Sequence, residues 1–197
     1  AASAASLAEL RAVLERFEGC PLRHTARNLV FGAGDPAAAV MFVGEAPGRE
    51  EDIEGVPFVG RSGRLLERML AAIGLSREEV FIANVLPWRP PGNNPPSDAD
   101  VATCLPFVVR QIELVAPSVL VCLGGAAAKT LLGRTDGITR LRGRWHAFES
   151  ERATIDTLAT LHPAYLLRQP REKRRAWHDF LMLAERLQGG GDEGAGR

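Results

Sequence analysis

A Gly/Pro turn crowded with carboxylates follows the apolar stretch at residues 40–44. The sequence there reads VMFVGEAPGREED, so Glu45, Glu51 and Asp52 follow a short run typical of a buried strand. A turn between a parallel strand and a helix is a common phosphate site, because its backbone amides point at the ligand. Carboxylates repel phosphate, so we expect this turn to hold a water molecule or to stabilise a positive charge.

Two further polar residues lie toward the ends of other apolar runs. Asn84 belongs to the run at 80–87, and His162 comes near the end of the run at 155–163. An amide suits the edge of a nucleobase, and a histidine can stabilise negative charge on a leaving group. Phe58 offers a ring for stacking. This set favours cleavage of a bond between sugar and base, and a nucleotide-binding α/β protein of another kind is the alternative.

Basic residues gather toward the end of the chain. The stretch from residue 134 to residue 175 contains ten Arg or Lys and five acidic residues. Within it, Tyr165 and Leu166 are followed by Arg168 and Lys173. Basic side chains contact phosphates, while an apolar side chain can fill the gap that an extruded base leaves. The alternative interpretation is an ordinary solvated helix face.

The elements that must position these residues alternate between strands and helices. The apolar runs predict buried strands at 37–44, 80–87, 117–125 and 155–163. Periodic segments and their caps predict the main helices at 6–19, 62–74, 98–115 and 170–187. This alternation predicts a parallel sheet covered on both faces, with a ligand site beyond the carboxyl ends of the strands. We expect one domain over residues 6–187 and a disordered tail over 188–197.

The composition sets limits on function. The 197 residues include 24 basic and 24 acidic side chains, so the net charge is zero and only local patches could attract a polyanion. An apolar content of 46% is ordinary for a soluble globular protein. The sequence contains no long apolar span and no export signal, and its three cysteines suit a reducing compartment. We therefore expect a cytoplasmic protein without a membrane partner.

Six segments occur in order along the chain and carry a resemblance. They are GEAPGREED, GVPFVGRSGRLLERML, ANVLPWRPPGN, CLPFVVRQIELVAP, LGG and HPAYLLR. Together, over roughly residues 20–187, they resemble the family 4 uracil-DNA glycosylases. The resemblance implies a three-layer α/β/α sandwich around a four-stranded parallel sheet. It also implies a monomeric base-excision repair enzyme, associated with the bacterial nucleoid, that hydrolyses the N-glycosidic bond of deoxyuridine in single- or double-stranded DNA.

The resemblance implies catalytic roles for the acidic turn and the histidine. Glu45 would belong to the uracil pocket, and Glu51 and Asp52 are the candidates for positioning the attacking water. His162 would stabilise the anionic oxygen of the departing uracil. Spacing leaves open which carboxylate matters most.

Binding roles are implied as well. Ala46 would line the uracil pocket through its backbone, Phe58 would stack on the flipped uracil, and Asn84 would hydrogen-bond its Watson–Crick edge. A loop implied to enter the duplex, with a basic residue beyond it, comprises Tyr165, Leu166, Arg168 and Lys173.

The cysteines depart from the family pattern. Family 4 enzymes hold a [4Fe–4S] cluster with four cysteines, the first two spaced C-x-x-C. Cys20 matches the second cysteine, but Phe17 stands at the first position and also completes the apolar stripe of the first helix. Cys104 matches the third cysteine, and Cys122 matches either the fourth or an ordinary core cysteine. We expect no cluster and no other cofactor, with a three-cysteine cluster as the alternative.

A second departure concerns proteins of this kind that become covalently trapped on the abasic sugar. Those proteins carry an inserted basic loop with a histidine after the strand that bears the asparagine. The corresponding segment here, VLPWRPPGNNPPSDAD, has no histidine, so we expect turnover. The alternatives are a non-catalytic or covalently trapping damage-binding protein on the same fold, and a small-molecule nucleoside hydrolase, which the basic stretch disfavours.

Overall fold

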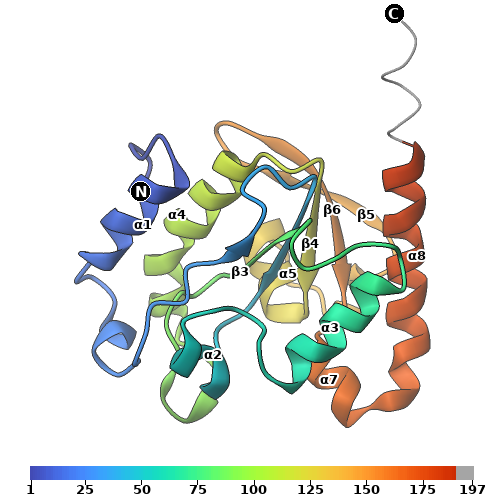
Figure 1. Cartoon of the computed structure of the whole chain (residues 1–197), viewed down its shortest axis with the longest axis horizontal. Coiled ribbons are helices and arrows are strands. Elements are labelled where there is room, and N and C mark those ends of the chain that lie inside the picture. The colour runs from blue at the N-terminus through green and yellow to red at the C-terminus, as the bar shows by residue number, and fades with distance from the viewer. Residues whose placement is uncertain (190–197) are drawn as a thin grey trace, which may run out of the picture.

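A six-stranded sheet forms the centre of the molecule in the computed structural model, which describes residues 1–189 (Figure 1). The strands are β1 (Ala33–Gly34), β2 (Val40–Gly44), β3 (Phe81–Asn84), β4 (Val119–Leu123), β5 (Trp145–Glu149) and β6 (Thr154–Thr160). Their order across the sheet is β1-β3-β2-β4-β6-β5. β3, β2, β4 and β6 run parallel to one another, whereas β1 and β5 are antiparallel edge strands.

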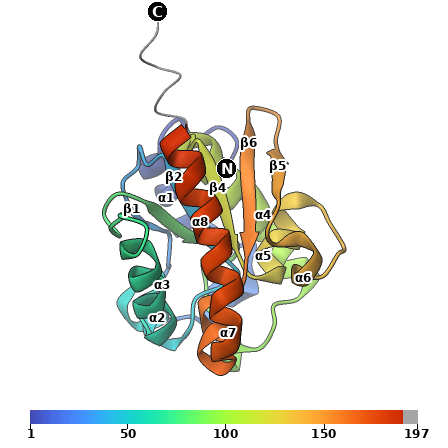
Figure 2. The same cartoon turned by 90° about the vertical axis from the view of Figure 1, so that its right-hand side faces the viewer.

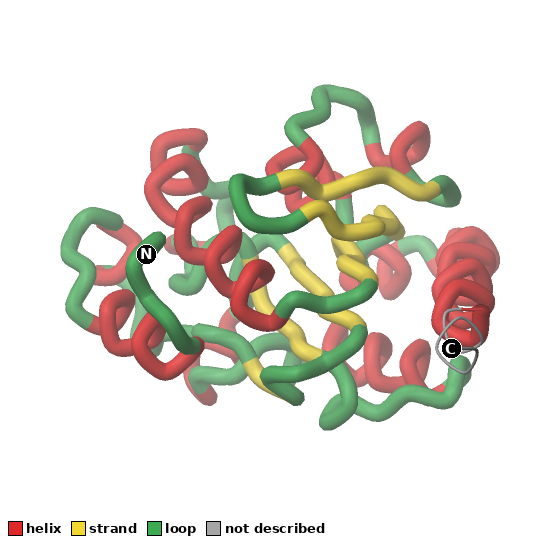
Figure 3. The backbone as a smooth tube through the Cα atoms, turned by 90° about the horizontal axis from the view of Figure 1, so that it is seen from above, coloured by secondary structure: helices red, strands yellow, loops and turns green. Residues whose placement is uncertain are grey.

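Helices cover both faces of this sheet, as the view from above shows (Figure 3). The α-helices are α1 (Leu7–Glu15), α2 (Arg49–Glu54), α3 (Arg61–Ala71), α4 (Asp98–Val115), α5 (Gly125–Leu132), α6 (Ile138–Leu141), α7 (Pro163–Arg168) and α8 (Lys173–Gly189). Three short 3-10 helices add η1 (Pro21–His24), η2 (Pro91–Asn93) and η3 (Pro170–Glu172). α1 and α4 lie on one side of the sheet, and α8 runs along the other beside α3 (Figure 2).

The two layers follow from the alternation of side chains along each strand. On β2, Met41 and Val43 belong to the apolar core that includes Leu10 of α1 and Ile112 of α4. Their neighbours on the same strand belong to a second core that contains Leu66 and Leu70 of α3 and Phe180 and Leu183 of α8. A sheet buried on both faces explains why the central strands read as unbroken apolar runs.

The predicted four-stranded parallel sheet is the centre of the observed sheet but not all of it. The α/β class is confirmed, while the strand count is wrong because both antiparallel edge strands were left out. β1 has only two residues, and β5 has only one buried residue, so neither carries the apolar run that identifies a central strand.

The end of the chain departs slightly from the predicted boundary. α8 continues through residues 188 and 189, which the sequence placed in a disordered tail. The remainder of that predicted tail, residues 190–197, lies outside the described residues. Among residues 1–189, no helix is both long and apolar enough to cross a membrane.

Candidate active site

A cavity of about 470 Å³ opens at the carboxyl ends of the parallel strands. All four strands contribute to its wall: residues 45–48 follow β2, Asn84 ends β3, residues 123–126 begin at the last residue of β4, and His162 follows β6. Phe58 and the turn at residues 90–96 complete it. The structure therefore brings four segments that are distant in the sequence to one crevice, at the edge that the parallel sheet predicts.

Asn84 presents an unsatisfied hydrogen-bond acceptor in this cavity. Its side chain is buried, and Oδ1 is the one buried side-chain oxygen or nitrogen in the described part of the chain that lacks a partner. Asn84 stands beside Gly44 in the sheet, and a Cβ on Gly44 would lie 2.5 Å from Oδ1. A buried acceptor without a partner costs free energy, so its place in a cavity indicates a ligand that donates a hydrogen bond.

The ring of Phe58 forms an aromatic wall beside this amide. Phe58 is 4% exposed and has a φ of 54°, a conformation that non-glycine residues rarely adopt. Arg77 holds it there by donating hydrogen bonds to the carbonyl oxygens of Pro57 and Phe58. Gly63 allows it, because a Cβ at residue 63 would lie 1.7 Å from the Phe58 oxygen. The sequence pattern identified Phe58 but gave no signal for Arg77 or Gly63.

His162 is held as a neutral imidazole with a defined tautomer. The backbone amide of Ala164 donates to Nδ1 at 3.1 Å, so the proton of the neutral ring resides on Nε2. Burial, and secondarily the positive charge of Arg168, lowers the pKa of His162 to about 4. Its ring centroid lies 5.5 Å from that of Phe58. Near neutral pH, His162 can therefore donate one hydrogen bond without carrying charge.

Glu45 is the carboxylate of the cavity without an observed partner. Among the described residues it makes no ion pair, and burial raises the pKa of its side chain above the ordinary value of 4.5. Its backbone is fixed, because the amide of Leu86 donates to the Glu45 carbonyl at 3.0 Å. The following residue, Ala46, also lines the cavity. A partly buried carboxylate on a fixed backbone is suited to binding a water molecule or facing a cation.

Glu51 also lines the cavity, but its carboxylate is occupied by backbone amides. Oε2 accepts from Gly48 at 3.1 Å, and Oε1 accepts from Val59 and Gly60, each at 3.0 Å. Gly48 is the N-cap of α2 and Gly60 is the N-cap of α3, so one side chain ties the two helix starts together. The predicted role of positioning water would compete with these three hydrogen bonds.

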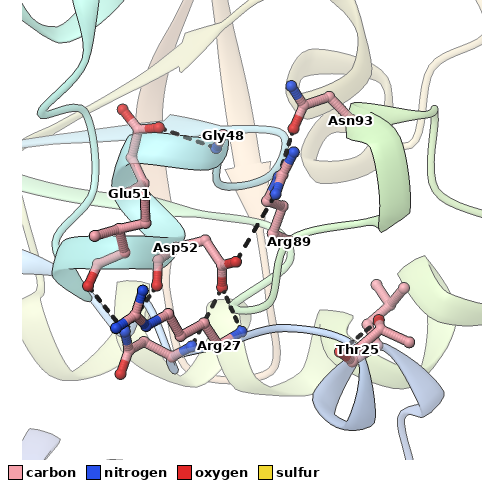
Figure 4. A network of polar contacts seen from close by, with 10 residues as sticks. Thr25, Arg27, Gly48, Glu51, Asp52, Arg89 and Asn93 are labelled. Atoms are coloured by element: carbon pink, nitrogen blue, oxygen red, sulfur yellow. Dashed lines mark hydrogen bonds and ion pairs between the residues drawn. The ribbon is translucent and has the colours of Figure 1, made fainter.

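Asp52 points away from the cavity and fastens a neighbouring segment (Figure 4). Its Oδ1 accepts from the backbone amides of Arg27 and Asn28 at 2.8 and 3.2 Å. Its Oδ2 lies 4.0 Å from Arg89, which in turn donates to Asn93. The structure thus places Asp52 in a network that supports the cavity wall, apart from the residues that the sequence analysis grouped it with.

The predicted DNA-entering segment is a helix rather than a loop. Residues 163–168 form α7, in which Leu166 is buried at 1% exposure in a small apolar core, whereas Tyr165 is 37% exposed and lines the cavity. Arg168 lines the cavity as well. Lys173 lies at the start of α8 and lines a separate hollow nearby. Leu166 is therefore a packing residue, and Tyr165 is the aromatic side chain that faces outward.

Comparison with known proteins identifies the group to which this arrangement belongs. The sequence profile of the uracil DNA glycosylase superfamily matches residues 31–181. The chain belongs to this superfamily. It is 42% identical over 170 residues to the type-4 uracil-DNA glycosylase of Archaeoglobus fulgidus, covering 84% of this chain and 85% of that protein. The type-4 uracil-DNA glycosylase of Thermotoga maritima is 40% identical over 156 residues, 79% of this chain and 80% of that protein. The predicted likeness to family 4 is confirmed.

The cysteines of this member of the superfamily do not fit a four-thiolate cluster. Burial, the neighbouring Cys20 and Asp100 together raise the pKa of the Cys104 thiol. Cys122 lies inside β4, where burial alone raises its pKa to about 12. Within residues 1–189, no three His, Cys, Asp or Glu side chains are placed to hold a metal ion. The position three before Cys20 is filled by Phe17, whose ring packs on Phe107 with centroids 4.9 Å apart.

Proposed function

We propose that the protein is a monofunctional uracil-DNA glycosylase of base-excision repair. It hydrolyses the N-glycosidic bond of deoxyuridine in DNA, releases uracil and leaves an abasic site. Membership of the superfamily and the likeness to several type-4 uracil-DNA glycosylases support this activity. The single structural observation that carries it is the unpaired Oδ1 of Asn84 in a cavity that also holds a neutral His162.

Uracil recognition follows from complementary hydrogen bonds. The imide N–H of uracil donates to Asn84 Oδ1. This hydrogen bond removes the free-energy cost of leaving a buried acceptor without a partner. The ring stacks on Phe58, and a base reaches such a cavity only after it leaves the helical stack. Backbone around Ala46 closes the pocket beside the flipped base.

Bond cleavage then requires stabilisation of two developing charges. As the bond between C1′ and N1 breaks, its electron pair goes to N1 and spreads to the uracil oxygens, while the sugar becomes oxocarbenium-like. The Nε2–H of His162 donates to the anionic uracil oxygen, and a neutral donor suits this role because it keeps its proton. Glu45 faces the cationic sugar and holds the water whose oxygen attacks C1′. The proton released by the attacking water passes to the Glu45 carboxylate and from there to solvent.

The other predicted residues take supporting roles in this proposal. Glu51 holds the loops around the pocket through its three amide contacts, and Asp52 anchors the segment behind them. Tyr165 fills the space of the extruded nucleotide, with Arg168 and Lys173 facing the phosphates. No lysine lines the cavity among the described residues, so the product is an intact abasic strand without a lyase nick.

The test is an oligonucleotide that carries one labelled uracil, offered as single strand and as duplex, followed by hot alkali. Uracil release with an alkali-dependent break supports the proposal, and the absence of any break in both forms overturns it. Asn84→Ala removes the acceptor, and we expect kcat/KM to fall about 10- to 100-fold, the equivalent of about 1–3 kcal/mol. DNA binding should persist in this variant.

A purely binding protein on the same fold is disfavoured, because binding alone does not require the partly buried Glu45 carboxylate in the cavity. Covalent trapping is disfavoured because the loop that follows β3 and lines the cavity contains no histidine, the residue that the trapped proteins carry there. Enzyme incubated with uracil-containing DNA and boiled in SDS should separate from it. A DNA adduct that survives boiling would establish trapping instead.

We also propose that the enzyme works without an iron–sulfur cluster, as a monomer in the cytoplasm. Phe17 packing on Phe107 supports the first point, because an aromatic pair occupies the place of one ligand. Iron and sulfide assays on anaerobically purified protein test the cluster, and light scattering tests the monomer. Stoichiometric iron and sulfide would show that three cysteines suffice.

A further inference from the structure

We propose that the seam between α3 and α7, extended to Lys173 at the start of α8, is a phosphate track that binds one flank of the DNA strand next to the flipped nucleotide. α3 and α7 are packed neighbours along the lower edge of the molecule in Figure 1. This inference rests on the proposed function, and it adds three arginines of α3 that the sequence analysis did not assign: Arg61, Arg64 and Arg68.

The track begins at the cavity and is continuous with it. A hollow of about 350 Å³ shares Ser62 and Arg168 with the cavity and extends to Arg61 and Leu167. A second hollow of about 230 Å³ shares Arg61 and Leu167 with the first and is lined further by arginines of α3 and by Lys173. A strand whose uracil occupies the cavity therefore has an open path along this seam.

The three arginines form one stripe on α3. They occupy positions i, i+3 and i+7, which face the same side of a helix, while Leu66 and Leu70 pack into the core. All three arginines are exposed. Seven residues of helix span about 10 Å, a length over which one DNA strand presents about three phosphates at 3.4 Å per charge along the duplex axis.

The charges of the track are available to a ligand. None of its cations, namely Arg61, Arg64, Arg68, Arg168 and Lys173, has an ion-pair partner among the described residues. Glu67, the acid on the same helix, pairs with Arg77 at 3.3 Å. Two acids line the first hollow: Glu50, and Glu51, whose carboxylate is bound by three backbone amides. In a chain with zero net charge, five unpaired cations along one seam indicate a local polyanion site.

The experiment compares two triple variants with the same change in charge. The track variant carries Arg61→Gln, Arg64→Gln and Arg68→Gln, and the control carries Arg16→Gln, Arg134→Gln and Arg152→Gln, exposed arginines that line neither the cavity nor the two hollows. For each, the equilibrium constant for binding an unmodified oligonucleotide is measured against salt concentration. We expect the track variant to lower the slope of log K against log salt by about 2 on single strands and nearly 3 on duplex. The control should retain the wild-type slope.

The length of DNA on each side of the uracil tests which of the two flanks the track binds. Single-uracil oligonucleotides with one flank lengthened at a time are cleaved under steady-state conditions. We expect the track variant to lose the gain in kcat/KM that the wild type obtains from one of the two flanks. Equal slopes for both triples, or loss of the gain from both flanks, would overturn the track.

Two controls separate this inference from others. Wild-type cleavage of any of these oligonucleotides establishes the glycosylase activity, so a failed track leaves that activity standing. Vesicles of anionic lipid test the competing polyanion. Capture of the wild type but not of the track variant, with an unaltered DNA slope, would assign the seam to a lipid surface and overturn the proposal.

Discussion

Glu45 and Glu51 line the same cavity six residues apart, yet the structure uses their carboxylates in opposite ways. Glu51 accepts three hydrogen bonds from backbone amides at the starts of two helices. Glu45 has no such contacts, and burial raises its pKa. A carboxylate satisfied by the fold contributes to stability, whereas one held partly buried without partners carries a desolvation cost, as is typical of functional sites. The comparison therefore separates a structural acid from the acid that we propose to be reactive.

The largest expected effect tests the reactive member of the pair. Glu45→Gln keeps the size of the side chain but removes its charge, so the water and the cationic sugar lose their carboxylate. We expect kcat to fall about 10²- to 10⁴-fold, the usual contribution of a general base. Because the raised pKa shows that the charge is unfavourable in the folded state, the thermal midpoint should stay the same or rise. A large loss of thermal stability would contradict the assignment.

The pH dependence of kcat tests the same difference between the two acids. On the acid side we expect kcat to fall about tenfold per pH unit. In the proposed mechanism Glu45 acts as a carboxylate, so we expect activity to fall as pH decreases through its pKa, which lies above 4.5. In the same mechanism His162 acts as the neutral ring, which persists until pH falls to about 4, so we expect it not to set this limb. We expect Glu45→Gln to abolish the limb above pH 4.5. If His162→Gln abolishes it instead, the histidine acts in its charged form and the proposed tautomer is wrong.

Sequence patterns predicted the strands that position this site but not the different roles of its residues. The four central strands were predictable because burial on both faces produces continuous apolar runs, and the strand ends then located Asn84 and His162. The sequence does not distinguish Glu51 from Glu45. They differ because the backbone amides of residues 48, 59 and 60 donate hydrogen bonds to the Glu51 carboxylate. Hydrogen-bond partners of this kind depend on the folded turn.

The same limit applies to the apolar and basic residues. Leu166 and Tyr165 are adjacent in the sequence, and only the helical geometry of α7 turns one into the core and the other outward. The α3 arginines could have been noticed from their helical spacing. Their meaning depends on the seam with α7, a contact between segments about a hundred residues apart.

Glu51→Gln tests the structural member of the pair, with an intermediate effect. The neutral amide can accept at Oε1, but its NH₂ group faces the Gly48 amide that Oε2 now satisfies. One buried donor then loses its partner, and we expect the free energy of unfolding to fall by about 1–3 kcal/mol. Activity should fall in parallel, because α2 and α3 begin at the amides that Glu51 holds. Urea denaturation measures the first effect; a kcat loss as large as that of Glu45→Gln with unchanged stability would reverse the two roles.

The smallest effect is expected at Asp52, the acid that the sequence placed beside Glu51 as a water-positioning candidate. Asp52→Asn keeps an oxygen for the amides of Arg27 and Asn28 but removes the charge that faces Arg89 at 4.0 Å. Charge-assisted hydrogen bonds exceed neutral ones by about 1 kcal/mol, so the thermal midpoint should fall by about 2–4 °C in a protein of this size. Because Asp52 does not line the cavity, kcat should remain that of the wild type. A tenfold loss of kcat at an unchanged midpoint would place Asp52 in the catalytic set and leave Glu45 as one of two reactive acids.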